Sequence, residues 1–265
     1  MVAGRDRNGT GRMLAEERRR QILHLVNEEG KVLVEDLAKR FSTSEVTIRL
    51  DLEDLQGRGL VHRTHGGALP VPNGALLDRN LAEKEKLYRR EKARIAQAAA
   101  KLVQEGQSVV LDSGSTTTMI ARVLRTFRNL TIITNALNIA AELAGNNLEV
   151  ILVGGGLRKE SFSLVGPFAE EVLGKLSPDI LFLGVDGFDV GFGMTTPNPQ
   201  EARVNRLMVE AADRTVVVCD SSKFGRRSLC LIAPTSAADQ VITDSGVPRP
   251  DREKLEQAGI VVTVV

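Results

Sequence analysis

The sequence is short of residue types on which several common protein chemistries depend. It has only two cysteines, Cys219 and Cys230, among 265 residues. Two thiols cannot build a disulfide framework or the four-ligand site of a structural metal ion. All three histidines, His24, His62 and His65, lie within the first 70 residues. The rest of the chain therefore lacks the side chain that most often serves as general base or metal ligand.

Long apolar runs and a strong charge bias are also missing. No run approaches the roughly 20 apolar residues that cross a bilayer, and residues 1–20 are polar and rich in arginine without an apolar signal region. We therefore expect a cytoplasmic protein without a membrane partner. Because the net charge is only +1, any DNA-binding surface must arise from the local placement of cations.

Length and composition predict two domains and flanking segments. Residues 1–14 are polar and predict a disordered tail, and residues 15–69 form a small domain. A segment with proline, asparagine and glycine at 70–81 predicts a linker, which leaves 82–265 as a larger domain. In the small domain, helical and then alternating periodicity predicts helices at 15–29, 34–41 and 45–56 and a β-hairpin at 60–68.

In the larger domain, short β-branched runs alternate with helical patterns. This alternation predicts an α/β fold with a mostly parallel sheet covered by helices. The expected strands are 108–111, 130–133, 149–153, 180–184, 215–219, 240–242 and 261–265. The expected helices are 82–104, 118–126, 137–143, 167–175, 201–212 and 251–258. The long helix at 82–104 is expected to pack on its own sheet rather than form an oligomer contact.

The third predicted helix has the pattern of a recognition helix. Ile48, Leu52 and Leu55 form its apolar stripe, and the preceding polar turn makes a helix-turn-helix. In that geometry the N-terminal turns of the recognition helix, here the helix at 45–56, approach bases and phosphates. The expected DNA contacts are Ser44, Glu45, Thr47 and Arg49, with His62, Arg63 and His65 on a hairpin wing. Alternatively, the three helices are a small packing module, and Arg49 is a solvated charge.

The most distinctive segment of the larger domain follows its first strand. Here Asp112, Ser113, Gly114, Ser115, Thr116 and Thr117 lead into a helix. Backbone N–H groups and the helix dipole favour an anion at such a helix N-terminus, and the hydroxyls add donors. A phosphate fits this site. The alternative is an ordinary helix cap with spare hydroxyls.

Other strand ends carry polar or glycine-rich residues that would meet at the same edge of the sheet. They are Asn135, Gly155, Asp186 and Lys223. Ligands of open parallel sheets bind outside the carboxyl ends of the strands. Lys223 is the expected counter-charge of the phosphate, unless it is simply a lysine in solvent, and Asp186 is an acceptor for sugar hydroxyls or an amine. Neither a dinucleotide fingerprint nor a P-loop occurs, and we expect no cofactor, no metal site and no catalytic residue.

The small domain resembles the DeoR family of sugar-metabolism regulators. The resemblance runs from Arg18 to Ala68 and includes Thr47-Ile48-Arg49 and the later Asp51. The family pattern is usually Thr-Ile-Arg-Arg-Asp, whereas Leu50 stands here in place of the second arginine. A leucine on this outward face suits a thymine methyl group and implies a sequence preference different from the typical one.

The larger domain is similar to the effector domain of the same family, at residues 111–124, 181–187, 201–214 and 220–229. The resemblance implies a fold shared with ribose-phosphate isomerases, glucosamine-phosphate deaminases and CoA transferases. It also implies that the segment from Asp112 to Thr117 and Lys223 hold the phosphate of a sugar effector. The residues around Asp186 and Glu201 resemble the amino-sugar branch, in particular repressors of the N-acetylgalactosamine type.

These observations predict a regulator, usually a repressor in this family, that binds double-stranded operator DNA as a dimer or tetramer and responds to a phosphorylated sugar. Two other hypotheses stay open from the residues. One is a sugar-phosphate isomerase or deaminase with a DNA-binding appendage, for which Asp186, Glu201 and Lys223 would be catalytic. The other is a constitutive DNA-binding protein whose large domain only oligomerises.

Overall fold

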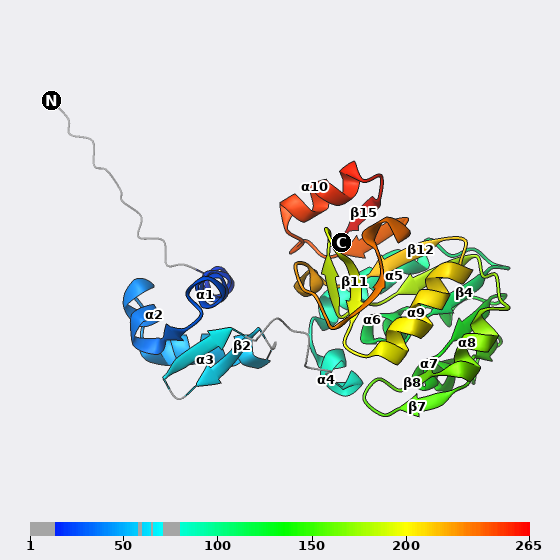
Figure 1. The fold of residues 1–265 in the computed structure, drawn as a ribbon, viewed down its shortest axis with the longest axis horizontal. Helices are drawn as coiled ribbons and strands as arrows, with labels where there is room; N and C mark the ends of the chain where they lie inside the picture. Colours follow the sequence, from blue (N-terminus) through cyan, green and yellow to red (C-terminus); the bar gives the residue numbers. More distant parts are fainter. Residues whose placement is uncertain (1–13, 58–59, 65, 71–79) are drawn as a thin grey trace. The chain divides into compact units, whose positions relative to one another are not determined.

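The structure, a computed structural model, describes residues 14–57, 60–64, 66–70 and 80–265. The chain divides into two compact units, residues 1–72 and 73–265, and each is described by itself (Figure 1). The predicted tail up to residue 13, most of the predicted linker and His65 lie outside the described residues.

The N-terminal unit contains the predicted three helices and β-hairpin, together with one extra short strand. The helices are α1 (Ala15–Glu29), α2 (Val34–Arg40) and α3 (Glu45–Gly57); the strands are β1 (Val32–Leu33), β2 (Val61–Thr64) and β3 (Gly67–Pro70). The strands pair antiparallel in the order β1-β3-β2. Ile48, Leu52 and Leu55 of α3 are buried among apolar residues of the other elements, as their spacing predicts. The helices and the hairpin together form a winged helix-turn-helix.

The C-terminal unit is built on a seven-stranded parallel sheet, and all seven strands predicted from the sequence belong to it. In spatial order they are β15 (Val261–Val264), β14 (Gln240–Thr243), β12 (Thr215–Val218), β9 (Ile180–Leu183), β4 (Ser108–Leu111), β5 (Thr131–Thr134) and β6 (Glu149–Leu152). Every adjacent pair is parallel. Their carboxyl ends therefore lie along one edge.

Helices cover both faces of this sheet because its strands are apolar on both sides. One face packs against α8 (Pro167–Leu173), α9 (Pro199–Ala211) and α10 (Arg249–Gln257). The other packs against α5 (Arg89–Ala100), α6 (Ser115–Leu124) and α7 (Leu137–Leu143). Side chains alternate between the two layers, so Val110 joins the first core whereas Val109 and Leu111 join the second.

The predicted long helix at 82–104 is wrong, because two helices occupy this segment. They are α4 (Leu81–Lys86) and α5, which begins at Arg89. Leu87 is extended and Tyr88 has a left-handed backbone with φ of 52°. That conformation cannot continue a right-handed helix. The prediction that this segment packs on its own sheet is confirmed for α5, because Ile95 and Ala99 are buried in the core.

Short antiparallel strands decorate the parallel sheet and were not predicted. They are β7 (Gly156–Arg158) with β8 (Ser163–Val165), and the sheet of β10 (Gly187–Asp189), β11 (Gly193–Thr196) and β13 (Cys230–Ala233). Two short 3-10 helices also occur, η1 (Ser221–Lys223) and η2 (Thr235–Ala237). These segments follow the carboxyl ends of the parallel strands.

The strand order reverses between β4 and β9. From β4 the chain adds β5 and β6 on one side, and it then returns to place β9 on the other side of β4. In open α/β sheets such a switch point leaves a crevice outside the carboxyl ends of the two strands, where ligands bind. Asp112 and Gly184 are the residues that directly follow these two strands.

Candidate DNA-binding and anion-binding sites

The N-terminal turn of α3 is held by its own polar side chains. The hydroxyl of Ser44 accepts a hydrogen bond from the backbone N–H of Thr47 at 3.2 Å, so Ser44 caps the N-terminus of α3. The hydroxyls of Ser44 and Thr47 lie 2.9 Å apart. Arg49 donates to Glu45 one turn earlier, at 2.6 Å. This ion pair is exposed and contributes little stability. Arg49 can therefore exchange Glu45 for a phosphate or a guanine at little energetic cost.

The outward face of α3 is partly apolar. Val46 and Leu50 expose 63% and 58% of their surfaces, as expected for residues opposite the buried stripe. On the wing strand β2, His62 is exposed and Arg63 is half-buried. The predicted DNA contacts that the structure describes are therefore accessible, on α3 and on β2.

Asp51 is the fixed point between α3 and α1, a role that sequence reasoning missed. Its side chain is almost fully buried, and its two carboxylate oxygens accept from Arg18 Nε at 2.5 Å and Arg19 Nε at 3.0 Å. Two adjacent arginines on α1 thus bind one carboxylate on the recognition helix. Asp51 sits on the face of α3 turned away from the exposed Val46 and Leu50, so it positions the helix without facing DNA.

In the C-terminal unit, the hydroxyl-rich segment after β4 forms the first turn of α6. Its periodicity predicts a helix that starts at residue 118, but α6 starts at Ser115. The hydroxyls of Thr117 and Thr118 donate to the Gly114 carbonyl oxygen at 3.0 and 2.7 Å. The N–H groups of the first helical turn have no partner inside the helix and form the positive end of its dipole. These N–H groups, more than the threonine hydroxyls, are available to an anion. The structure places Ser113 and Gly114, both half-buried, directly before this turn, and Thr116 within it.

Asp112 lies at the switch point, buried against Gly184. A side chain on Gly184 would begin 3.4 Å from Asp112 Oδ1, so the carboxyl packs directly on the glycine. Burial raises the pKa of Asp112 well above its usual range; hydrogen bonding with Gly184 and Thr117 opposes the rise, and the negative charges of Glu201 and Asp186 add to it. Because the charged form of Asp112 is disfavoured, this acid repels a neighbouring phosphate less than an ordinary aspartate would.

Three lysines gather near Asp186. Lys84 Nζ lies 2.6 Å from Asp186 Oδ1, and Lys92 Nζ donates to the Lys84 carbonyl oxygen at 2.5 Å. Lys223, in η1 after β12, is close enough for its charge to act on both Asp186 and Lys92. Lys84 of α4, Lys92 of α5 and Lys223 of η1 thus form a cluster of cations around Asp186, which follows β9.

The same charges set the protonation of this cluster. Desolvation raises the pKa of Asp186, but the charges of Lys84 and Lys223, with hydrogen bonds from Lys84 and Thr196, outweigh it and lower the pKa overall. Burial lowers the pKa of Lys92 to about 8; Asp220 opposes this, and Lys223 and Lys84 reinforce it. Asp186 is therefore anionic at neutral pH, and Lys92 is a cation that burial makes costly.

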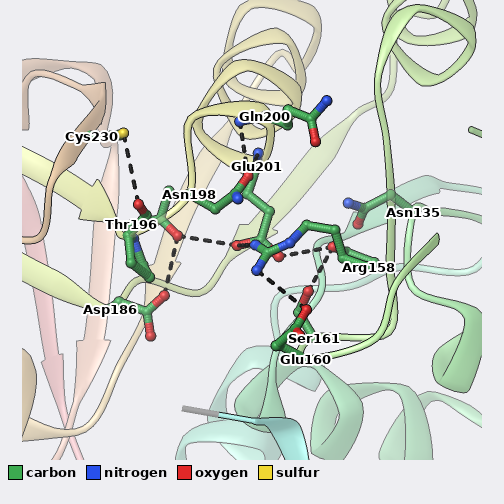
Figure 2. Close-up of polar contacts among 12 residues, drawn as sticks. Asn135, Arg158, Glu160, Ser161, Asp186, Thr196, Asn198, Gln200, Glu201 and Cys230 are labelled. Atoms are coloured by element: carbon green, nitrogen blue, oxygen red, sulfur yellow. Dashed lines mark hydrogen bonds and ion pairs between the residues drawn. The ribbon is translucent and has the colours of Figure 1, made fainter. Parts of the chain in front are cut away.

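A buried polar network extends from Asp186 to the β7–β8 hairpin (Figure 2). Glu201, at the start of α9, accepts from Ser163 at 2.8 Å and pairs with Arg158 at 2.9 Å. The Thr196 hydroxyl lies 3.2 Å from Asp186 and 3.4 Å from Glu201, so it bridges the two acids. The structure thus brings together Asp186 and Glu201, as the sequence predicts.

Two other predicted effector-binding residues occupy the hairpin side of the site. Asn135 is buried after β5, and its side chain donates to the Leu164 carbonyl oxygen at 3.3 Å. Gly155 has φ of +115°, and a side chain there would begin 2.6 Å from the Val165 carbonyl oxygen. Asn135 holds the β7–β8 hairpin against the end of β5, and Gly155 permits its close approach to Val165 of β8. These contacts account for the identity of both residues independently of any ligand.

Sequence reasoning missed Lys84, Lys92, Arg158 and Thr196. Lys84 and Lys92 lie on helices that precede β4, the first strand of the parallel sheet. They were therefore missed by a search confined to residues that follow strands. Arg158 and Thr196 lie on short antiparallel strands that lack a long periodic pattern. One signal was present for Lys92, because it occupies an otherwise apolar stripe with Ile95, Ala96 and Ala99.

Two structural findings bound the chemistry of the described part of the chain. None of its helices is long and apolar enough to cross a membrane. Within the same described residues, no three or more histidine, cysteine, aspartate or glutamate side chains are grouped so that they could hold a metal ion.

Comparisons with known proteins identify both units of the chain. Residues 18–71 match the DeoR-like helix-turn-helix domain, and residues 88–245 match the DeoR C-terminal sensor domain. A protein of Escherichia coli O157:H7 designated an aga operon transcriptional repressor is 41% identical, over 94% of this chain and 93% of that protein. The HTH-type transcriptional regulator GlpR of Haloferax volcanii is also 41% identical, over 94% and 98%. Among solved structures, ribose 5-phosphate isomerase A of Methanocaldococcus jannaschii is similar with a TM-score of 0.38 and 19% identity, over 50% of this chain and 53% of that chain.

A winged helix-turn-helix joined to an α/β sensor domain defines a DNA-binding transcription regulator. The chain belongs to the DeoR family. The family resemblance seen in the sequence is thereby confirmed. Because this family consists of regulators and not of enzymes, the alternative of an isomerase or deaminase with a DNA-binding appendage is set aside.

Proposed function

We propose that this protein represses genes of carbohydrate metabolism and that a phosphorylated sugar, bound at the switch point of the C-terminal sheet, relieves the repression. One observation carries the proposal: Lys84 and Lys223 act on Asp186 after β9, and Asp186 in turn acts on Asp112, which follows β4 and leads into α6. The names of relatives support repression as the regulatory effect. Besides the aga operon relative, the glycerol-3-phosphate regulon repressor of Escherichia coli K12 is 34% identical over 88% of this chain and 92% of that protein.

The expected effector is a hexosamine phosphate. Its phosphate would lie against the segment from Asp112 to Thr117 and against Lys223. Its hydroxyl or amino groups would donate to Asp186 and Glu201, two acids that Thr196 already links. The resemblance of the segments around these acids to the amino-sugar branch of the family supports this choice.

The expected DNA contacts are Ser44, Glu45, Thr47 and Arg49 on α3, and His62, Arg63 and His65 on the wing. Ser44, Thr47 and Arg49 are bonded to one another or to Glu45 without DNA, and these exposed bonds exchange readily for bonds to phosphate. One short recognition helix gives limited affinity, so we expect a homodimer or a homotetramer that engages paired half-sites.

Operator retardation with added ligands tests both halves of the proposal. We expect the full-length protein to prefer a genomic fragment over random DNA at physiological salt. N-acetylgalactosamine 6-phosphate or galactosamine 6-phosphate should then weaken the complex about fivefold or more, as in typical allosteric coupling, and the unphosphorylated sugars should not. A protein that prefers no fragment refutes the DNA-binding half. If operator affinity is unchanged by these two compounds and by glycerol 3-phosphate, the sensor half fails.

A further inference from the structure

The short helix α4 (Leu81–Lys86) occupies a special place in the chain. In sequence it directly follows the segment 71–80 that connects the two units, and it is the first helix of the C-terminal unit. Leu81 is buried, whereas the other residues of α4 are exposed or half-buried. A six-residue helix with so little apolar burial draws its stability from the contacts of its polar groups.

Those contacts lead to the candidate anion site. Lys84 pairs with Asp186 at 2.6 Å, and the Lys84 carbonyl oxygen accepts from buried Lys92. At its N-terminal end, the Leu81 N–H donates to the Glu160 carbonyl oxygen at 2.7 Å, between β7 and β8. Asp186 and Lys92 belong to the site, and Glu160 lies in the hairpin beside it. A separate ion pair joins Glu85 of α4 to Arg122 of α6 at 3.6 Å.

The far end of α4 is a break rather than a continuation. Leu87 is extended, and Tyr88 adopts the left-handed conformation before α5 begins. A non-glycine residue keeps such a backbone only where its surroundings impose it. Because α5 is anchored in the core through Ile95 and Ala99, a change in α4 can be absorbed at this break without disturbing α5.

We propose that α4 couples the anion site to the DNA-binding unit, and that Lys84 is the residue that changes partner when ligand binds. The inference rests on the proposed function, since it needs a phosphorylated ligand at the switch point. A phosphate dianion carries more negative charge than the single carboxylate of Asp186 and competes with it for Lys84. Once Lys84 leaves Asp186, α4 loses its ion pair with the site and keeps the weaker pair of Glu85 with Arg122. The first helix of the C-terminal unit is then held less firmly. The docked form of α4 is the form that binds operator tightly.

The decisive experiment uses ligand-free full-length protein. Lys84→Met removes the ion pair with Asp186, and Lys86→Met, at an exposed lysine on the same helix, is the matched control. We expect amide hydrogen exchange in 82–86 to become at least tenfold faster in K84M, and operator affinity to fall about fivefold or more, which is the range of typical coupling. K86M should match wild type in both. Lys84→Arg keeps the charge and should restore both, and unchanged exchange in α5 shows that the unit remains folded.

A second arm adds N-acetylgalactosamine 6-phosphate, with inorganic phosphate as the simpler probe. Wild type and K86M should show faster exchange in 82–86 and weaker operator binding with ligand, whereas K84M should not respond further. If ligand-free K84M keeps wild-type exchange and operator affinity, the coupling role of α4 is refuted even where the ligand still binds. If wild type responds to neither probe while ligand-free K84M shifts as expected, the coupling stands and the proposed effector class is wrong.

Discussion

Replacing Asp51 with alanine is expected to loosen the helix-turn-helix and abolish specific operator binding. The substitution leaves Arg18 and Arg19 without the carboxylate that both contact. Removal of one partner from a buried ion pair costs about 3–5 kcal/mol, and the lower end, about 3 kcal/mol, fits here because the arginines keep some contact with water. Since the carboxylate fixes α3 against α1, the expected DNA contacts on α3 are also no longer held in a fixed position.

Hydrogen exchange of the α3 amides in the full-length protein measures this loss, because exchange reports local opening within one unit. Operator retardation measures the functional consequence. Glu53→Ala, an exposed residue on the same helix, is the matched control and should behave as wild type. Wild-type protection of α3 in D51A would show that the two arginines do not position the recognition helix.

Replacing Lys223 with methionine is expected to weaken the binding of a sugar phosphate roughly 10- to 100-fold. A hydrogen bond to a charged group contributes about 1.5–3 kcal/mol, and each 1.36 kcal/mol is a factor of ten. Methionine keeps much of the length of the side chain and removes its charge. Lys92 and the N-terminus of α6 remain, so binding should be weakened rather than eliminated.

Titration calorimetry with N-acetylgalactosamine 6-phosphate gives the affinity directly. Lys254→Met, an exposed lysine on α10, controls for the loss of one positive charge from the unit. The unphosphorylated sugar separates phosphate contacts from sugar contacts, because its weak binding should not depend on residue 223. An affinity of K223M equal to that of K254M would remove Lys223 from the anion site.

The parallel sheet could be predicted because its signal is local. Seven short apolar, β-branched runs are bounded by polar or glycine-rich residues, and such runs form strands buried on both faces. The order of the strands could not be read from these runs, since it depends on which strands pair across the chain. The switch point between β4 and β9 follows from that order. Sequence reasoning thus named Asp112 and Asp186 as site residues without showing that a reversal of strand order brings them to one switch point.

The break between α4 and α5 shows a different limit. Residues 82–104 have nearly continuous helical periodicity, and helix propensity is favourable throughout. Tertiary contacts override it: the left-handed turn at Tyr88 lets Lys84 reach Asp186 while Ile95 stays in the core. Lys92 and Arg158 were missed for a related reason, because their roles come from distant partners and not from neighbours in sequence.

The lowered pKa of Lys92 limits the pH range over which the C-terminal unit should bind a phosphorylated ligand tightly. Beyond residue 65 the chain has no histidine, so no side chain of ordinary pKa changes charge there between pH 5 and 8. At acid pH, affinity should fall as the phosphate monoester protonates near its second pKa of about 6. At alkaline pH, Lys92 loses its proton above about 8, in a field set by Asp220, Lys223, Lys84 and Glu85. The cluster then has one cation fewer, so calorimetry across this range should give a bell-shaped profile with its plateau near neutral pH.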